Sequence, residues 1–202
     1  MSNQLQRLVD DFWEATLLKI IPQNIKPNHF TFLRLALTPV ILYFLATQHF
    51  YIALVLFVLA SLSDSIDGSL ARKRHQISEF GITLDPLADK LLIILSALFL
   101  FYYYPYFKIL LITVIIDIFI LAESVIIVVY NHNLKTPPSN WTGKGKMTFQ
   151  VLALFSIFVF VTSQSIIWLQ VSLMFLYLVI LTGLMSLVNY GYKSYNIIKL
   201  KK

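Results

Sequence analysis

The chain has 202 residues, of which 58% are hydrophobic and 13% are charged. This composition lies far outside the range of soluble domains and predicts one integral membrane domain over residues 1–202. There is no cysteine, which excludes a disulfide framework and thiolate chemistry, and the net charge of +6 is scattered in short clusters instead of forming the continuous basic face that a nucleic-acid partner requires.

The first segment, residues 4–21, has the pattern of an amphipathic helix. Apolar side chains, with Phe12 and Trp13 among them, recur at helical spacing between charged ones. The segment is too polar to cross a bilayer, so we expect it either to lie in the membrane interface or to pack against the rest of the protein. It lacks the pattern of a cleaved signal peptide. Pro27 then interrupts the chain, and Asn28 is expected to cap the next helix.

Six apolar stretches follow, and they predict an all-α membrane protein with six transmembrane helices. Each stretch is long enough to cross most of a hydrocarbon core of about 30 Å. The predicted spans are residues 30–47, 50–71, 82–104, 107–130, 147–163 and 167–192. Between the fourth and fifth spans, the polar stretch 131–146 contains Pro137, Pro138 and two glycines, and is predicted to be a loop.

Three charged residues fall inside predicted spans. Asp117 and Glu123 lie in the fourth span, where a charge that faces lipid is costly, so both are expected to face the interior of the bundle. Arg34 lies one turn inside the first span. It is expected to face the interior or an anionic group, or alternatively to extend toward the lipid headgroups.

The distribution of basic residues predicts the orientation in the membrane. Of the 16 Lys and Arg residues, only Lys108 falls on the side that carries the tyrosine-rich stretch Tyr102–Tyr106. The positive-inside rule then places the opposite side, with both termini and the junction of the second and third spans, at the cytoplasmic face.

Four aspartates at that junction form the most informative cluster in the sequence. Asp64 and Asp67 are three residues apart, and Asp85 and Asp89 are four apart, so each pair would project from one helix face. Clustered carboxylates repel each other unless a cation lies between them, and their oxygen atoms suit hard divalent ions such as Mg²⁺ or Mn²⁺. Helix caps in a solvated turn would explain one aspartate per helix end, but not two pairs.

The same stretch resembles the motif of the CDP-alcohol phosphatidyltransferase family, which reads D-x-x-D-G-x-x-A-R, eight residues, and then G-x-x-x-D-x-x-x-D. Every fixed position is present, as Asp64, Asp67, Gly68, Ala71, Arg72, Gly81, Asp85 and Asp89. The resemblance implies an enzyme that transfers the phosphatidyl group of a CDP-linked lipid, usually CDP-diacylglycerol, to an alcohol and releases CMP.

The resemblance also implies roles for individual residues. The metal ligands would be Asp64, Asp67 and Asp85, and Asp89 would share the second ion and act as the general base. The CDP moiety would contact Asp64, Gly68, Ala71, Arg72 and Gly81. Small residues leave room for a nucleotide against a helix, and Arg72 offers a planar set of donors to a phosphate. The alternative roles are an interfacial anchor for Arg72 and an ordinary turn glycine for Gly81.

The acceptor site is predicted from a second resemblance. The stretch Thr142–Thr148 is similar to the G-K-x-K-T sequence of phosphatidylglycerophosphate synthases. This similarity implies an acceptor, glycerol 3-phosphate, whose phosphate is bound by Lys144 and Lys146, and we expect Arg34 and Lys135 to be the supporting donors. Those synthases carry an Arg where this chain has Ala122, so one donor is missing. The stretch Asn189–Lys193 instead resembles cardiolipin synthases, whose acceptor is phosphatidylglycerol. As an alternative, both lysines would be plain basic residues at the end of a span.

Other functional classes fit the sequence less well. A metal-ion transporter would hold its carboxylates at mid-membrane and not at helix ends, and a scaffold would have no use for two aspartate pairs. We therefore expect a multi-pass phosphatidyltransferase that works in the lipid bilayer as a homodimer, with two divalent cations and without a nucleic-acid partner.

Overall fold

The computed structural model describes residues 8, 10–22, 24–74, 79–105, 107–130 and 141–199. The described residues form helices with short connections and include no strand, which confirms the all-α prediction. A short π-helix η1 (Glu14–Leu18) precedes six long helices, which are α2 (Pro27–Ala46), α3 (Phe50–Lys73), α4 (Glu79–Tyr103), α5 (Ile109–Tyr130), α6 (Trp141–Ser163) and α7 (Ile166–Lys199). Each long helix overlaps one of the six predicted spans.

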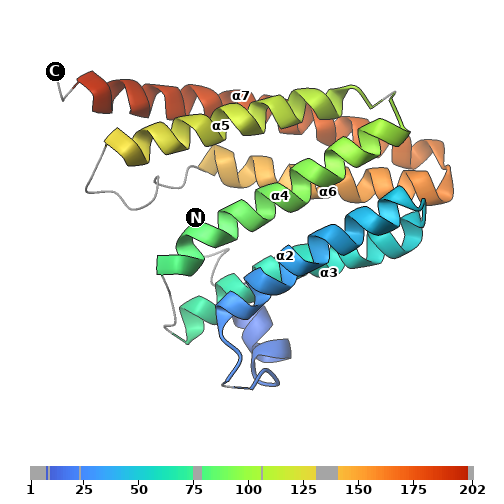
Figure 1. The fold of residues 1–202 in the computed structure, drawn as a ribbon, viewed down its shortest axis with the longest axis horizontal. Helices are drawn as coiled ribbons and strands as arrows, with labels where there is room; N and C mark the ends of the chain where they lie inside the picture. Colours follow the sequence, from blue (N-terminus) through green and yellow to red (C-terminus); the bar gives the residue numbers. More distant parts are fainter. Residues whose placement is uncertain are drawn as a thin grey trace.

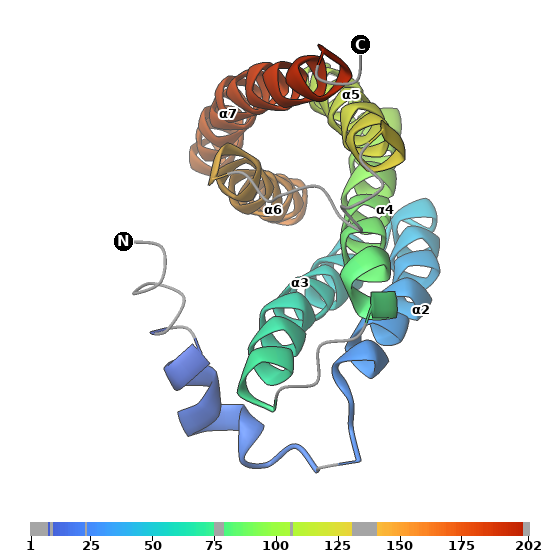
Figure 2. The ribbon, with the colours of Figure 1, turned by 90° about the vertical axis from the view of Figure 1, so that its left-hand side faces the viewer.

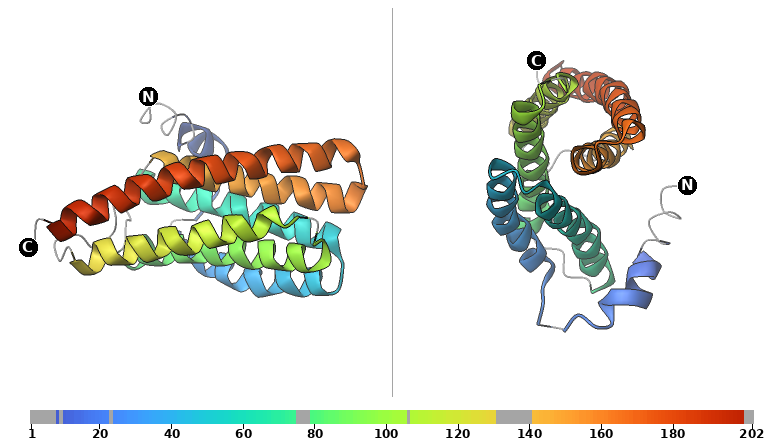
Figure 3. Two further views of the ribbon diagram at one scale, coloured as in Figure 1. Left: turned by 90° about the horizontal axis from the view of Figure 1, so that it is seen from above. Right: turned by 90° about the vertical axis from the view of Figure 1, so that its right-hand side faces the viewer.

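The long helices run up and down in one bundle, and α4 lies between two groups of helices (Figure 1, Figure 2). On one side α2 packs against α3, and on the other α7 packs against both α5 and α6. Helix α4 contacts α2, α3, α5 and α6, so it joins the two groups. Because consecutive helices alternate in direction, the start of α2, the end of α3 and the start of α4 lie at the same end of the bundle (Figure 3).

The interior of the bundle is mostly apolar, and much of its outer surface is apolar as well. Phe57 of α3 packs on Phe158 of α6 with ring centroids 5.3 Å apart, and both side chains are fully buried. Large apolar side chains such as Tyr43, Phe119 and Leu181 are exposed on the outside. An apolar exterior is expected for helices that face lipid, since burial in a bilayer replaces burial in a core.

Four of the described helices are long and apolar enough to cross a membrane. These are α2, α3, α6 and the part of α7 from Ile166 to Tyr192. The prediction of a membrane protein is therefore supported. The crossing of α4 and α5, which would complete the six predicted spans, stays a prediction.

The N-terminal segment packs against the protein over its described part. Its helical turns at residues 10–13 continue into η1, and both lie beside the end of α3 (Figure 2). Trp13 donates a hydrogen bond from its indole Nε1 to Ser65 Oγ of α3 at 2.8 Å. The described residues of this segment therefore follow the second of the two sequence-based alternatives, packing on the protein. The interfacial amphipathic helix over residues 4–21 stays a prediction.

Two predicted helix starts were wrong. Helix α2 begins at Pro27 with Lys26 as its N-cap, so Asn28 lies inside the first turn and is not the cap. The imidazole Nδ1 of His29 accepts a hydrogen bond from the backbone N–H of Lys26, so the side chain at N3 satisfies the donor of the N-cap residue itself.

Helix α6 begins at Trp141, within the stretch 131–146 that was predicted to be a loop. Gly143 and Gly145 are therefore helical, although each glycine costs about 1 kcal/mol in a helix relative to alanine. Helix α6 packs along α7, and this packing offsets the cost. A Cβ atom at Gly143 would be in ordinary contact with Ser186 Oγ at 3.6 Å.

Candidate active site

The two predicted aspartate pairs meet at one end of the bundle. Asp64 and Asp67 lie on the last turns of α3, and Asp85 and Asp89 lie on the first turns of α4. Asp67 is buried, whereas the side chain of Asp64 is 48% exposed. Asp64 lies within hydrogen-bonding reach of Asp89 on the facing helix. The cluster therefore has a closed side at Asp67 and an open side at Asp64.

Arg34 of α2 stands at the centre of this carboxylate cluster and is fully buried. Its Nη2 lies 2.7 Å from Asp67 Oδ2 and 3.5 Å from Asp64 Oδ1, and its Nη1 donates to Asp89 Oδ1. A buried guanidinium needs such partners, because an unpaired buried charge is strongly destabilising. The prediction that Arg34 faces the interior and an anionic group is confirmed.

Thr31, one turn before Arg34 on α2, completes the arrangement by donating a hydrogen bond from Oγ1 to Asp85. Helix α2 thus supplies a donor to each of the four aspartates. Sequence reasoning assigned no role to Thr31. The available signal was its spacing of three residues from Arg34, which places both side chains on the same face of a helix.

The donor set of this cluster is of the kind that hard divalent cations prefer, since it is made of carboxylate oxygens. Four carboxylates against one guanidinium also leave an excess of negative charge, which favours further cations. In the folded arrangement the carboxylates converge on Arg34. Within the described ranges no three acidic or histidine side chains are grouped as ligands of one common ion. The chemistry of the residues therefore fits metal ions, and the expected convergence of Asp64, Asp67 and Asp85 on one point is not present.

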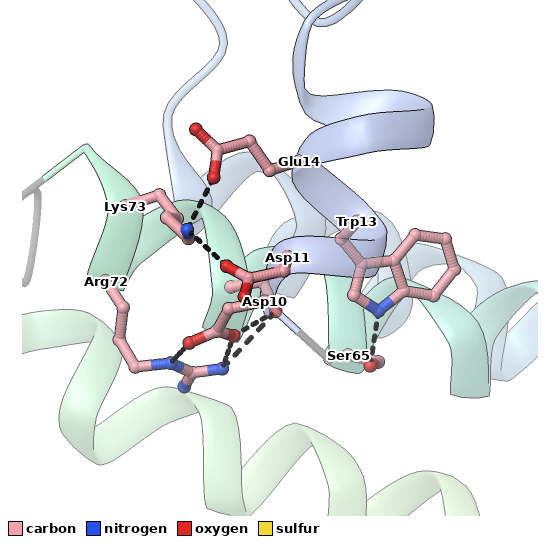
Figure 4. A network of polar contacts seen from close by, with 8 residues as sticks. Asp10, Asp11, Trp13, Glu14, Ser65, Arg72 and Lys73 are labelled. Carbon is pink, nitrogen blue, oxygen red and sulfur yellow. Dashed lines mark hydrogen bonds and ion pairs between the residues drawn. The ribbon is translucent and has the colours of Figure 1, made fainter. Parts of the chain in front are cut away.

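Arg72 lies on the exposed side of α3, two turns beyond Asp64, and binds the N-terminal segment (Figure 4). Its Nε and Nη2 atoms donate to the carboxylate of Asp10 at 3.0 and 2.7 Å. The hydrogen bonds from Arg72 lower the pKa of the Asp10 carboxyl below its usual value, which keeps Asp10 ionised at neutral pH. Sequence reasoning did not anticipate Asp10, because nothing in a local pattern relates residues 62 positions apart.

The small residues of the motif lie around Arg72. A Cβ atom placed at Gly68 would stand 3.2 Å from Arg72 Nη1, so the guanidinium lies over Gly68 and would have to shift by a few tenths of an ångström if a side chain were present there. Ala71 is partly buried on the same helix. Gly81 lies in the first turn of α4.

Of the four residues predicted to bind an acceptor phosphate, the three that the structure describes have different surroundings. Lys146 is buried and paired with Asp117 of α5, whose other carboxylate oxygen accepts a hydrogen bond from Gln150 Nε2 at 2.7 Å. Lys144, two residues earlier on α6, is exposed on another face. Arg34 belongs to the carboxylate cluster, and Lys135 lies outside the described residues. Their role as an acceptor site stays a prediction.

The prediction that the acidic residues of the fourth span face inward is confirmed for Asp117, which is buried. Glu123 is partly buried, and its Oε2 is enclosed without a hydrogen-bond partner among the described residues. Its Oε1 would stand 3.2 Å from a Cβ at Gly191 of α7, so α7 closes over Glu123.

Comparison with known proteins identifies the family. A family model for CDP-alcohol phosphatidyltransferases matches residues 24–181, which is most of the chain. One relative, a CDP-diacylglycerol--glycerol-3-phosphate 3-phosphatidyltransferase of Wigglesworthia glossinidia brevipalpis, is 31% identical over 175 residues, which cover 82% of this chain and 92% of the relative.

Two other relatives match over shorter stretches. The enzyme of the same name from Aquifex aeolicus (strain VF5) is 43% identical over 72 residues, and the human cardiolipin synthase (CMP-forming) is 47% identical over 68 residues. These matches cover 36% and 33% of this chain, but only 40% and 23% of the relatives. The match of the family model to most of the chain shows that it belongs to the CDP-alcohol phosphatidyltransferase family.

Proposed function

We propose that this protein transfers the phosphatidyl group of CDP-diacylglycerol to glycerol 3-phosphate and releases CMP, which makes phosphatidylglycerol phosphate. The observation that carries the proposal is the meeting of four aspartates at one end of an apolar bundle, with an open side at Asp64. A lipid whose tails stay in the bilayer can present a diphosphate at such an end. The names of the relatives support the choice of both substrates.

Two divalent cations, Mg²⁺ or Mn²⁺, would be held by Asp64, Asp67, Asp85 and Asp89. When bound, such ions neutralise a diphosphate and orient it for displacement. Residues on α3 would hold the rest of the nucleotide. Gly68 and Ala71 are small and leave room for a nucleotide against α3, and the guanidinium of Arg72 lies next to Gly68.

Asp89 is the proposed general base. The oxygen atom of the acceptor hydroxyl attacks the phosphorus on the lipid side, the bond from that phosphorus to the oxygen of CMP breaks, and the hydroxyl proton passes to Asp89. A base must be held within reach of the proton that it takes. Asp89 is held in place by Arg34, whose Nη1 donates to Asp89 Oδ1.

The acceptor site is proposed at the two lysines of α6. If Lys144 and Lys146 bind the acceptor phosphate, removal of either charge should raise the KM for glycerol 3-phosphate by about 10- to 150-fold and leave the KM for CDP-diacylglycerol nearly unchanged. For Lys146 the phosphate would have to share the lysine with Asp117. An isosteric change at the exposed Lys108, at the opposite end of the bundle, serves as the control.

The second candidate acceptor is phosphatidylglycerol, which would make the protein a cardiolipin synthase. The similarity to the human cardiolipin synthase favours it. Purified protein incubated with labelled CDP-diacylglycerol and a panel of acceptors distinguishes the two, because the lipid product differs. Cardiolipin formed without turnover of glycerol 3-phosphate would reject the first choice, and turnover of inositol phosphate or an amino alcohol alone would reject both.

We further propose that the carboxylate end of the bundle and both chain termini face the cytoplasm, and that the protein forms a homodimer. The charge distribution supports the orientation. Single cysteines introduced into this cysteine-free chain at positions 76 and 105 should react with an impermeant thiol reagent from opposite sides of the membrane. Crosslinking in native membranes tests the dimer.

A further inference from the structure

Three consecutive basic residues at the end of α3 hold the N-terminal segment. Lys73 Nζ bonds to Asp11 at 2.9 Å and to Glu14 at 2.5 Å. Arg74 donates to the backbone carbonyls of Leu18, Ile21, Pro22 and Ile25, at 2.6 to 3.3 Å. These contacts fix the backbone of the segment against the helix, so that its side chains have defined positions next to the carboxylate cluster.

Asp10 uses this position to bind one edge of Arg72. Its Oδ1 accepts hydrogen bonds from Arg72 Nη2 and from the buried Ser69 Oγ, both at 2.7 Å, and its Oδ2 accepts one from Arg72 Nε at 3.0 Å (Figure 4). The Asp10 side chain is itself nearly buried. The pairing is a two-point contact along the Nε and Nη2 edge, which fixes the plane of the guanidinium as well as its place.

The other edge of Arg72 is left open. Within the part of the chain that the structure describes, Nη1 donates no hydrogen bond, and the side chain is 38% exposed. Nη1 lies over Gly68. Gly68 is four residues after Asp64 on the same face of α3, so the two residues are about 6 Å apart along the helix axis. A phosphate bound at the open side of the carboxylate cluster would lie within reach of this edge.

We propose that Asp10 is a positioning residue for the nucleotide site. It holds the guanidinium of Arg72 over Gly68 with the Nη1 edge turned to the substrate, and Ser69 in turn fixes Asp10. The inference rests on the proposed function, in which Arg72 binds a phosphate of CDP-diacylglycerol. It adds the N-terminal segment, which lies outside the family motif, to the substrate-binding machinery.

The test measures the binding of CDP to the purified full chain in nanodiscs with Mg²⁺, beside the KM for each substrate. Asp10→Asn keeps the size of the side chain and removes its charge, so CDP should bind about 10-fold more weakly, with an equal rise in the KM for CDP-diacylglycerol and no change for the acceptor. Asp11→Asn is the matched control. The Asp11 carboxylate is 67% exposed and contacts Lys73 instead of Arg72. Lys73 keeps its bond to Glu14 in this variant, so the segment stays held and CDP binding should equal that of the wild type.

A double-mutant cycle separates positioning from general folding effects. In an Arg72→Lys background, Asp10→Asn should cause no further loss, because the group that Asp10 positions is already gone. Asp10→Glu should recover part of the binding. If Asp10→Asn fails to fold, Ser69→Ala serves instead: it removes the bond from Ser69 Oγ to Asp10 Oδ1 and the longer one, 3.3 Å, that Ser69 Oγ accepts from Arg72 Nη2. It should weaken CDP binding in the same direction by a smaller factor.

Three results would overturn the inference. Unchanged CDP binding in Asp10→Asn would show that Arg72 needs no partner, and tighter binding would show that Asp10 competes with the phosphate. A loss of equal size in the presence and absence of Arg72 would show a purely structural role. If the wild type itself bound no CDP and released no CMP, the proposed function would fail and the inference with it, which is a distinct outcome.

Discussion

Replacement of Arg34 by methionine should destabilise the protein strongly, and divalent cations should reverse much of the loss. The guanidinium of Arg34 is fully buried and lies within 3.5 Å of carboxylate oxygens from three aspartates. Removing one partner from a buried ion pair costs about 3–5 kcal/mol, because the remaining charge is left uncompensated. For a chain of this length that loss corresponds to a fall of about 6–20 °C in the unfolding temperature.

A cation that binds the freed carboxylates should restore stability. At a concentration 100-fold above its Kd, an ion that binds only the folded state contributes about 2.7 kcal/mol, which is more than half of even the larger estimated loss. The assay is thermal unfolding of the detergent-solubilised protein in a titration of Mg²⁺. The baseline is a buffer from which a chelator has removed divalent cations. Lys108→Gln, which removes an exposed charge at the opposite end, should change neither quantity.

The reasoning would be refuted if Arg34→Met unfolded at the wild-type temperature in chelated buffer, since three carboxylates would then need no counterion. A large loss that Mg²⁺ did not reduce would leave Arg34 as a structural partner. It would also count against the carboxylate cluster as a cation site.

Three further outcomes are expected. Asp64→Asn and Asp67→Asn should each abolish CMP release and weaken Mn²⁺ binding measured by paramagnetic resonance, because each removes a carboxylate from the cluster. Asp117→Leu and Lys146→Met should each lower stability by about 3–5 kcal/mol, whereas the double variant should lose less than either alone, because no buried charge of the pair is left unpaired. A double variant whose unfolding temperature falls by the sum of the two single losses would contradict this. Arg72 lowers the pKa of Asp10, so this pair stabilises the docked N-terminal segment above the ordinary aspartate pKa of 3.8 and loses its effect as the pH falls below it. The fluorescence of Trp13, with the other tryptophans replaced, should therefore stay constant from neutral pH down to about 5 and change below about 4, and Asp10→Asn should reduce that change.

The sequence predicted the long helices well because apolar runs of about 20 residues set their positions. It failed where a helix depends on tertiary contacts. Gly143 and Gly145 carry turn propensity in isolation, and only the packing of this stretch on α7 makes it helical. The cap of α2 was misplaced for a similar reason, since the bond between Lys26 and His29 is not a common capping pattern.

The carboxylate cluster was predictable because its chemistry is encoded by residue type and helical spacing. The place of the Arg34 guanidinium at its centre was not predictable, because Arg34 comes from another helix. The depth of Arg34 in the first span did predict an anionic partner. The partners of Arg72 and Lys146 were missed for the same reason. Asp10 and Asp117 are 62 and 29 residues away in the chain, and no local pattern connects them.

The central claim is that the carboxylate end of this bundle transfers a phosphatidyl group. The most direct test uses CDP-diacylglycerol labelled in its lipid phosphate, with glycerol 3-phosphate, in parallel reactions of the wild type, Asp85→Asn and Asp89→Asn. In Mg²⁺ the wild type should move the label into phosphatidylglycerol phosphate and release one unlabelled CMP for each product, and chelation or either variant should stop both. Equal CMP release by the wild type and by Asp85→Asn and Asp89→Asn, or none by the wild type with any acceptor, would contradict the claim.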